Sequence, residues 1–204
     1  MTRRGSFRAR ASGALAGVLL AVLVAGCGSE STDVAAAPTP APSSSAAAPA
    51  VRTPQAGSAP VRLLIPEIGV DSALMELGLQ PDGSLEVPPT GFPAGWFTGA
   101  PAPGATGPAV MAGHVDWEGS PGVFYDLRLL EPADEITVTR TDGSSAVFSV
   151  VSVEQFDKDA FPTDAVYGDL DHAGLRLITC GGSYDPGERS YTDNIVVFAE
   201  LLPA

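Results

Sequence analysis

The sequence predicts an all-β domain over residues 61–204, with its strands arranged in a closed barrel or in a sandwich. Eight short segments that read as strands are separated by turn residues, a spacing typical of these two architectures. The segment Thr141–Ser145, with Asp and Gly near its centre, is a hairpin signal between two of them. The length is close to that of the commonest domains, so a single domain can bury a sizeable core.

Each predicted strand is bounded by residues that favour turns. Pro66 ends the first strand, and the turn Pro81-Asp82-Gly83 precedes the third. In chain order, the strands are predicted at Val61–Ile65, Ala73–Leu79, Ser84–Val87, Pro108–His114, Glu135–Arg140, Ala146–Phe156, Leu175–Cys180 and Asn194–Leu201. Between them we expect a Pro- and Gly-rich loop over Gly91–Gly107, a helical turn within Pro121–Leu130, and a short irregular or 3₁₀ connection over Asp159–Tyr167.

Residues 1–26 have the pattern of an export signal. Met1–Arg10 contains four arginines, and the apolar run Ala11–Ala25 carries no charge. This run is shorter than the about 20 residues that a membrane span needs, but it suits the apolar core of a signal peptide. It ends in Leu-Val-Ala-Gly-Cys27, which resembles the lipobox of bacterial lipoproteins and implies cleavage before Cys27 and lipid attachment to that residue. An uncleaved short anchor is the alternative.

Residues 27–60 are predicted to be a lipidated cysteine followed by a disordered tether. The segment is dominated by Ala, Pro, Ser and Thr, and such a composition cannot bury enough apolar surface to offset the entropy lost on ordering. As a partly extended chain at ~3.1 Å per residue, it could reach on the order of 100 Å. It would hold the domain of residues 61–204 at the extracellular face of the cell membrane.

The charge balance argues against nucleic acid as a partner. The chain has 11 Lys and Arg residues and 24 Asp and Glu residues, and four of the arginines lie in the predicted signal, which has no acidic residue. The processed chain would keep 7 basic residues against 24 acidic ones, whereas a surface that binds nucleic acid is basic. The acidic residues show no EF-hand spacing, so we expect no metal and no cofactor.

Cys180 is the residue at which the sequence predicts a reactive site. Lipidation of Cys27 would leave Cys180, the other of the two cysteines, as an unpaired thiol outside the cytoplasm, where cysteines usually pair or are avoided. Gly181 and Gly182 follow it, and we expect them to end the strand and to clear space beside the sulfur. These features favour a nucleophile, with a buried packing cysteine as the alternative.

Two further side chains are candidates to act with Cys180. Alternation along the strand puts Arg176 and Cys180 on one face, so both could face a cleft, with an exposed edge strand as the alternative. A cysteine nucleophile also needs a base or a cation beside it. His114, at the end of a predicted buried strand, is the better candidate because His172 lies in an acidic turn.

The same residues carry a resemblance to a known family. Gly113-His114 after an apolar strand, followed later by Leu177-Ile178-Thr179-Cys180, resembles the sortases, whose central strand ends in Thr-Leu-x-Thr-Cys or close to it. The opening Leu64–Val70, the segment around Trp96 and the segment Asp193–Val197 extend the resemblance over nearly all of residues 61–204.

Within that family, the pieces Cys180–Gly182 and Tyr191–Asn194 are most similar to the actinobacterial class F (class E/F) branch. The resemblance implies a closed eight-stranded sortase-type β-barrel with short helical or 3₁₀ connections. It also implies cysteine transpeptidase chemistry, in which Cys180 attacks a sorting signal of Leu-Pro-x-Thr-Gly type and His114 alternates between acid and base. The implied partners are sorting-signal peptides, an amine acceptor from a peptidoglycan precursor or another protein, and the membrane through the N-terminal lipid. We expect a monomer.

The third catalytic residue is where this sequence departs from the family pattern. Most sortases carry an arginine on the last strand, where this chain has Asp193 or Asn194. Arg176 is the first choice for the role, because alternate residues on a strand lie about 7 Å apart, a gap that an arginine side chain can cover. Arg189, in the loop before the last strand, is the alternative.

Three other functions fit parts of the pattern. An L,D-transpeptidase also pairs cysteine with histidine, but that family places Ser-His-Gly before the cysteine, where this chain has Leu177-Ile178-Thr179. A thiol hydrolase would form the same acyl-enzyme and release it to water. A non-enzymatic lipoprotein binding module would contain Cys180 as an inert buried thiol.

Overall fold

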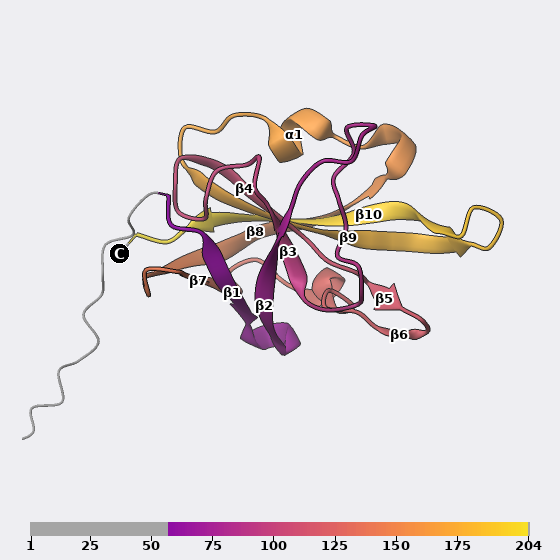
Figure 1. Ribbon diagram of the computed structural model, residues 1–204, viewed down its shortest axis with the longest axis horizontal. Helices are drawn as coiled ribbons and strands as arrows, with labels where there is room; N and C mark the ends of the chain where they lie inside the picture. The colour runs from indigo at the N-terminus through magenta and orange to yellow at the C-terminus, as the bar shows by residue number, and fades with distance from the viewer. Residues whose placement is uncertain (1–56, 204) are drawn as a thin grey trace, which may run out of the picture. The chain divides into compact units, whose positions relative to one another are not determined.

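Ten strands and four short helices make up the part of the chain that the computed structural model describes, residues 57–203 (Figure 1). The strands are β1 (Pro60–Ile65), β2 (Val70–Leu77), β3 (Ala94–Phe97), β4 (Gly107–Ala112), β5 (Asp116–Trp117), β6 (Ser120–Pro121), β7 (Glu135–Arg140), β8 (Ser145–Asp157), β9 (Ala173–Asp185) and β10 (Ser190–Leu201). The helices are α1 (Thr163–Tyr167) and the 3₁₀ helices η1 (Pro66–Ile68), η2 (Leu127–Leu129) and η3 (Lys158–Ala160). The predicted signal, Cys27 and most of the predicted tether lie outside the described residues.

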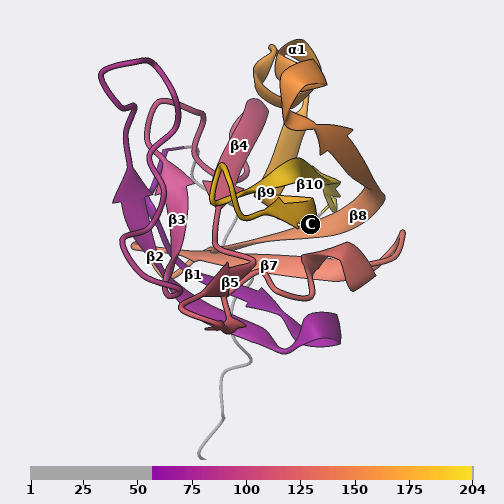
Figure 2. The ribbon, with the colours of Figure 1, turned by 90° about the vertical axis from the view of Figure 1, so that its right-hand side faces the viewer.

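Eight of the strands close into one barrel. Their order around it is β1-β2-β3-β4-β9-β10-β8-β7, and β7 pairs with β1 to complete the ring (Figure 2). The sheet is mixed, because β2 pairs with β3 and β4 pairs with β9 in parallel, while the other neighbours are antiparallel. The two-stranded ribbon of β5 and β6 lies outside this sheet. The prediction of a closed eight-stranded β-barrel with short helical connections is therefore confirmed.

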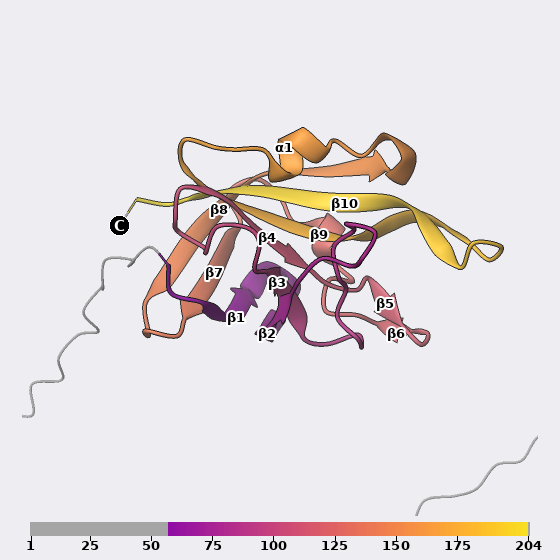
Figure 3. The same ribbon diagram turned by 45° about the horizontal axis from the view of Figure 1, so that its top comes forward.

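The strands bury apolar side chains on both faces of the sheet. Inside the barrel, residues such as Leu63, Phe148 and Leu177 are fully buried in the main core. A second cluster on the outer face joins Val110 of β4 to Val166 of α1. Figure 3 shows α1 and its flanking loops lying over this side of the barrel. All six residues of β4 are buried for this reason, whereas β1 and β7 alternate in part between buried residues and more exposed ones.

Most predicted strands are present, but one is wrong, and one strand of the barrel and the short ribbon of β5 and β6 were missed. Ser84–Val87 forms no strand, and the segment touches a sheet partner only in an isolated bridge between Leu79 and Leu85. The missed barrel strand is β3, which lies inside the predicted loop Gly91–Gly107. The expected helical turn in Pro121–Leu130 is η2, and the connection Asp159–Tyr167 contains α1.

None of the helices within residues 57–203 is long and apolar enough to span a membrane.

Candidate active site

The parallel strands β4 and β9 bring His114 and Cys180 to the same end of the barrel. Ala112, the last residue of β4, lies opposite Ile178 of β9, and the backbone N–H of Gly113 donates to the Ile178 carbonyl at 3.1 Å. His114 follows at once, at the level where β9 reaches Cys180. Because β9 also pairs with β10 along this stretch, the sheet itself fixes the position of the cysteine backbone.

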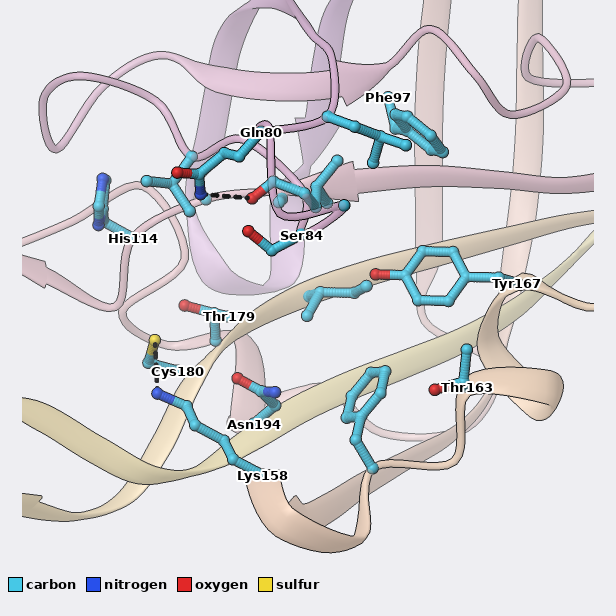
Figure 4. A pocket seen from close by; sticks show the side chains of 18 residues that line it. Gln80, Ser84, Phe97, His114, Lys158, Thr163, Tyr167, Thr179, Cys180 and Asn194 are labelled. Atoms are coloured by element: carbon cyan, nitrogen blue, oxygen red, sulfur yellow. Dashed lines mark hydrogen bonds between the residues drawn. The ribbon is translucent and has the colours of Figure 1, made fainter.

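A groove with a volume of about 860 Å³ opens beside the thiol (Figure 4). Cys180 is a free, half-buried cysteine, and Figure 4 shows His114 on the facing side of the groove. The apolar lining comes largely from the segment between β2 and β3, from β3 and from the connection around α1: Leu79, Leu85, Val87, Phe97, Phe161 and Tyr167. The polar lining near the sulfur comprises His114, Lys158, Thr179 and Asn194.

A backbone carbonyl sets the tautomer of His114. Its Nε2 lies 2.7 Å from the Pro88 carbonyl oxygen, and since a carbonyl can only accept, Nε2 carries a proton and donates it. In the neutral ring, Nδ1 is then the nitrogen that exchanges a proton. The imidazole also packs against the indole of Trp117, with ring centroids 4.8 Å apart. The ring is therefore held from two sides, by Pro88 in the segment between β2 and β3 and by Trp117 of β5.

A hydrogen bond joins β10 to the segment that carries His114. Tyr191 Oη donates to Asp116 Oδ2 at 2.6 Å, and this bond, with a smaller effect of burial, raises the pKa of Tyr191 to about 12. Asp116 lies two residues after His114. Tyr191 also borders a second cavity of about 370 Å³, which is lined in part by Cys180 and Arg128. Cys180 therefore lines both cavities.

Lys158 is the cationic side chain that the structure places against the thiol. Its Nζ lies 3.8 Å from Cys180 Sγ and donates a 2.8 Å hydrogen bond to Ser190 Oγ. The residue follows directly after β8, in η3, and the pairing of Asp157 with Asp193 in β10 brings it to the cysteine. Sequence reasoning missed it. The available signal was that Lys158 is the only lysine of the chain.

Arg176 lies apart from the groove. Its side chain is 7% exposed, its guanidinium stacks on the Phe198 ring at 4.6 Å from the centroid, and Nη1 donates to the Leu175 carbonyl. Nη1 would lie only 3.2 Å from a Cβ added at Gly174, so the side chain runs back toward the start of β9, away from Cys180. Burial lowers the pKa of Arg176. The expectation that the arginine and the thiol face one cleft is therefore wrong.

Arg189 and Asn194, which could also fill the third catalytic role, lie at different distances from the groove. Arg189 is exposed in the turn between β9 and β10 and borders neither cavity. Asn194 pairs directly with Cys180 across β9 and β10 and lines the groove. Neither is within a hydrogen bond of Sγ in the part of the chain that the structure covers, where Lys158 alone makes that contact.

The two glycines after Cys180 do not end the strand, because β9 continues to Asp185. They instead allow β10 to approach closely. A Cβ at Gly181 would lie 2.7 Å from Ile195 Cγ1, and one at Gly182, whose φ is +75°, would lie 2.5 Å from Thr192 Oγ1. The pairing of β9 with β10 shifts register between Tyr191 and Asp193, at the same place.

Residues 57–203 contain no cluster of three or more His, Cys, Asp or Glu side chains arranged to hold a metal ion. The chemistry that the site offers is that of a thiol with an imidazole and an ammonium group near it. A thiolate is the nucleophilic form of cysteine, and both a base and a nearby cation favour it.

Comparisons with known proteins identify the family of this chain. The family described as "Sortase domain" matches residues 63–202. Among solved structures, a lid mutant of sortase A from Corynebacterium diphtheriae is similar, with a TM-score of 0.56 and 18% identity over 74% of this chain and 73% of that chain. Sortase C-1 from Actinomyces oris matches with a TM-score of 0.54 and 19% identity, over 71% of this chain and 74% of that chain.

Sortase D5 from Clostridium perfringens is also similar, with a TM-score of 0.52 and 22% identity over 73% of this chain and 82% of that chain. No curated protein sequence matches the chain. The structural similarities at this low identity establish the shared barrel, and the family match covers more than half of the sequence. The chain therefore belongs to the sortase domain family, the cysteine transpeptidases that act on sorting signals.

Proposed function

We propose that this protein is a class F sortase in which Cys180 is the nucleophile and His114 is the general acid and base. One observation carries the proposal: adjacent parallel strands deliver the free thiol and the imidazole to one groove. The assignment to class F is supported by the resemblance of Cys180–Gly182 and Tyr191–Asn194 to that branch.

The proposed reaction has two steps. The Cys180 thiolate attacks the carbonyl of the scissile peptide bond, the tetrahedral intermediate collapses to a thioester, and the leaving amine takes a proton from His114. An incoming amine then gives a proton to His114 and attacks the thioester, which releases the thiolate. One group that alternates between acid and base serves both steps. Because Nε2 is bound to the Pro88 carbonyl, Nδ1 is the atom that we assign to the proton transfers.

The groove supports a peptide substrate with small and branched apolar residues. Phe97, Phe161 and Tyr167 line it together with aliphatic side chains, and such surfaces bind apolar side chains and exclude water. A signal of Leu-Pro-x-Thr-Gly type could place its leucine and proline against this wall, with the threonine carbonyl at Cys180. The amine acceptor would come from the cell envelope, as a peptidoglycan precursor or a second protein.

Intact mass spectrometry tests the first step. The protein is mixed with a Leu-Pro-x-Thr-Gly peptide and quenched in acid, and we expect an adduct with the mass of the peptide minus its C-terminal part. Cys180→Ala should form none, because the nucleophile is gone, and it should lose essentially all peptide cleavage. Amine acceptors added to the wild type should then release the adduct as a ligated product.

The alternatives predict different results in the same experiment. A thiol hydrolase would form the adduct but release it to water even when an amine is in excess. An inert thiol that gives no adduct and resists alkylation would contradict the proposed function and favour a binding module.

We also propose that the enzyme is exported and lipid-anchored through Cys27. The charged and apolar segments before Cys27 and the Leu-Val-Ala-Gly sequence that leads to it support this proposal, as does the composition of the following segment. The domain would then act at the outer face of the membrane, where sorting signals emerge.

A further inference from the structure

Lys158 is the only lysine of the chain, and its ammonium group lies beside the thiol of Cys180. The Nζ–Sγ distance is 3.8 Å, and this contact is the one hydrogen bond to Sγ found among residues 57–203. Ser190 Oγ accepts a second hydrogen bond from Nζ at 2.8 Å. Figure 4 shows the lysine side chain extended along the groove toward the sulfur. The chain thus places its single amino side chain at its single described thiol.

Lys158 is also the only lysine or arginine that lines the groove. Both residues are half-buried, and opposite charges about 4 Å apart in such a site attract more strongly than in bulk water. The hydrogen bond to Ser190 already restricts the Lys158 side chain. Less conformational entropy is therefore lost when Lys158 pairs with Cys180. A cation in this position favours the thiolate over the thiol.

We propose that Lys158 is a catalytic residue whose ammonium group stabilises first the Cys180 thiolate and then the oxyanion formed by its attack. The first half stands on the geometry alone, and the second half rests on the proposed function. When Sγ bonds to the carbonyl carbon, the carbonyl π pair moves to oxygen, so the negative charge passes from sulfur to an atom close by. Collapse re-forms the carbonyl, breaks the C–N bond and transfers a His114 proton to the amine.

The position of the cation also explains why neither predicted arginine is needed. Arg176 points toward the start of β9, and Arg189 borders neither cavity. The other titratable and charged groups near the pair are His114 and Tyr167 on the groove, Arg128 and Tyr191 at the smaller cavity, Asp116 bound to Tyr191, and Asp193 beside Lys158. Of these, Tyr191 keeps its proton well above neutral pH and Asp193 is an acid, so neither supplies positive charge.

Alkylation of the full-length protein by iodoacetamide tests the pairing without any substrate. Alkylation rates are measured from about pH 5 to 9, and peptide mapping distinguishes alkylation of Cys180 from alkylation of Cys27. Lys158→Met keeps most of the length of the side chain and removes its charge, so we expect alkylation at neutral pH to slow by about tenfold, with the half-maximal rate reached at higher pH. Lys158→Arg should retain most of the wild-type rate because it restores the cation.

Arg62→Met is the matched control, since it also removes one positive charge, from an exposed ion pair with Asp71 on β1 and β2. It should leave the alkylation profile at the wild-type position. Melting temperatures verify that the variants fold, and Lys158→Gln serves as a second neutral variant if Lys158→Met does not. A neutral variant that alkylates at the wild-type rate at every pH would overturn the proposal.

Peptide cleavage tests the oxyanion role separately. Removing one preorganised donor to an oxyanion costs about 100-fold or more in turnover, so Lys158→Met should lose more in kcat for the acylation step than the slower thiolate formation explains. If Lys158→Met lowers kcat/KM only by the factor by which it slows alkylation, the proposed oxyanion role is wrong. If the wild type cleaves no sorting peptide, the proposed function fails, and the alkylation profile still decides whether Lys158 and Cys180 form a pair.

Discussion

Arg176 shows that two residues can share a strand face while their side chains take opposite directions. Its neighbours across the sheet are Val110 and Phe198, and the guanidinium stacks on the aromatic ring instead of extending toward the thiol. Nε is buried without a hydrogen-bond partner within residues 57–203. A buried, incompletely paired charge carries a desolvation penalty, which the cation–π contact offsets only in part.

This burial leads to a prediction about stability. Arg176→Ala removes the packing against Phe198, whereas Arg176→Met keeps most of the volume and removes the buried charge. We therefore expect Arg176→Met to be more stable than Arg176→Ala by about 1–3 kcal/mol in urea unfolding. Both should retain more peptide cleavage than Lys158→Met. Selective loss of cleavage in Arg176→Met, with stability unchanged, would return the third catalytic role to Arg176.

At the scale of single residues, Cys180 and His114 could be located from the sequence because each follows an apolar run. Lys158 could not be located in this way, because a lysine in a polar connection reads as an ordinary solvated residue. Its approach to the thiol depends on how far β8 extends along β10, and the pairing continues to Asp157 and Asp193. That register is a tertiary property that local patterns do not report.

The long hairpin of β9 and β10 is tied to the His114 segment by Tyr191 and Asp116. The raised pKa of Tyr191 means that this hydrogen bond stabilises the fold below about pH 10 and is lost as the pH rises through about 12. The linkage has this sign because the folded-state pKa exceeds the ordinary value. The bond acts over the whole range in which the enzyme would work.

Tyr191→Phe should weaken this connection without altering the groove. We expect a loss of about 0.5–1 kcal/mol at neutral pH, because solvent screens a half-exposed bond. We also expect a decrease of about tenfold in kcat/KM, because His114 is held less firmly. Tyr184→Phe is the control, since Tyr184 packs on Tyr191 but is 53% exposed. A stability difference between Tyr191→Phe and the wild type that persists above pH 12 would contradict the role of the hydroxyl group.

The segment between β2 and β3 shows why strand prediction was only partly successful at the level of elements. Ser84–Val87 alternates like a strand, yet its apolar side chains Leu85 and Val87 line the groove. By contrast, β3 has the sequence Ala-Gly-Trp-Phe, and its first two residues are of types that are depleted in strands. It forms because β2 and β4 pair with it on both sides, and Gly95 allows Leu77 to lie where a Cβ would be.

At the scale of the whole molecule, the barrel and its groove are separated in sequence from the predicted anchor. Anchoring by a lipid on Cys27 predicts that Cys27→Ser moves the protein from the membrane fraction to the soluble fraction, because the lipid has no other attachment point. Cys180→Ser is the control and should stay with the membrane. Fractionation followed by immunoblotting measures the distribution. Retention of Cys27→Ser in the membrane would favour an uncleaved apolar anchor.

The closed barrel itself followed from the sequence because eight short strands with turns between them, together with the family resemblance, leave few arrangements. The pairing of β4 with β9 did not follow from strand spacing. Parallel neighbours require a crossover connection, and here the 60 residues between Ala112 and Ala173 contain β5 to β8 and α1. The structure shows that the chain returns after these 60 residues to place β9, which carries Cys180, beside β4, which leads to His114.

The position of Lys158 bears on whether the enzyme acylates itself. An acyl-transfer catalyst that accepts amines is exposed to self-labelling by any lysine on its surface. This chain has ten arginines and one lysine, and a guanidinium, which stays protonated, is a poor acyl acceptor. The one lysine is half-buried and bound to Ser190 and to the thiol of its own chain, which keeps it from reaching the active site of a second molecule. The protein should therefore remain unmodified at concentrations at which a lysine-rich enzyme would conjugate to itself.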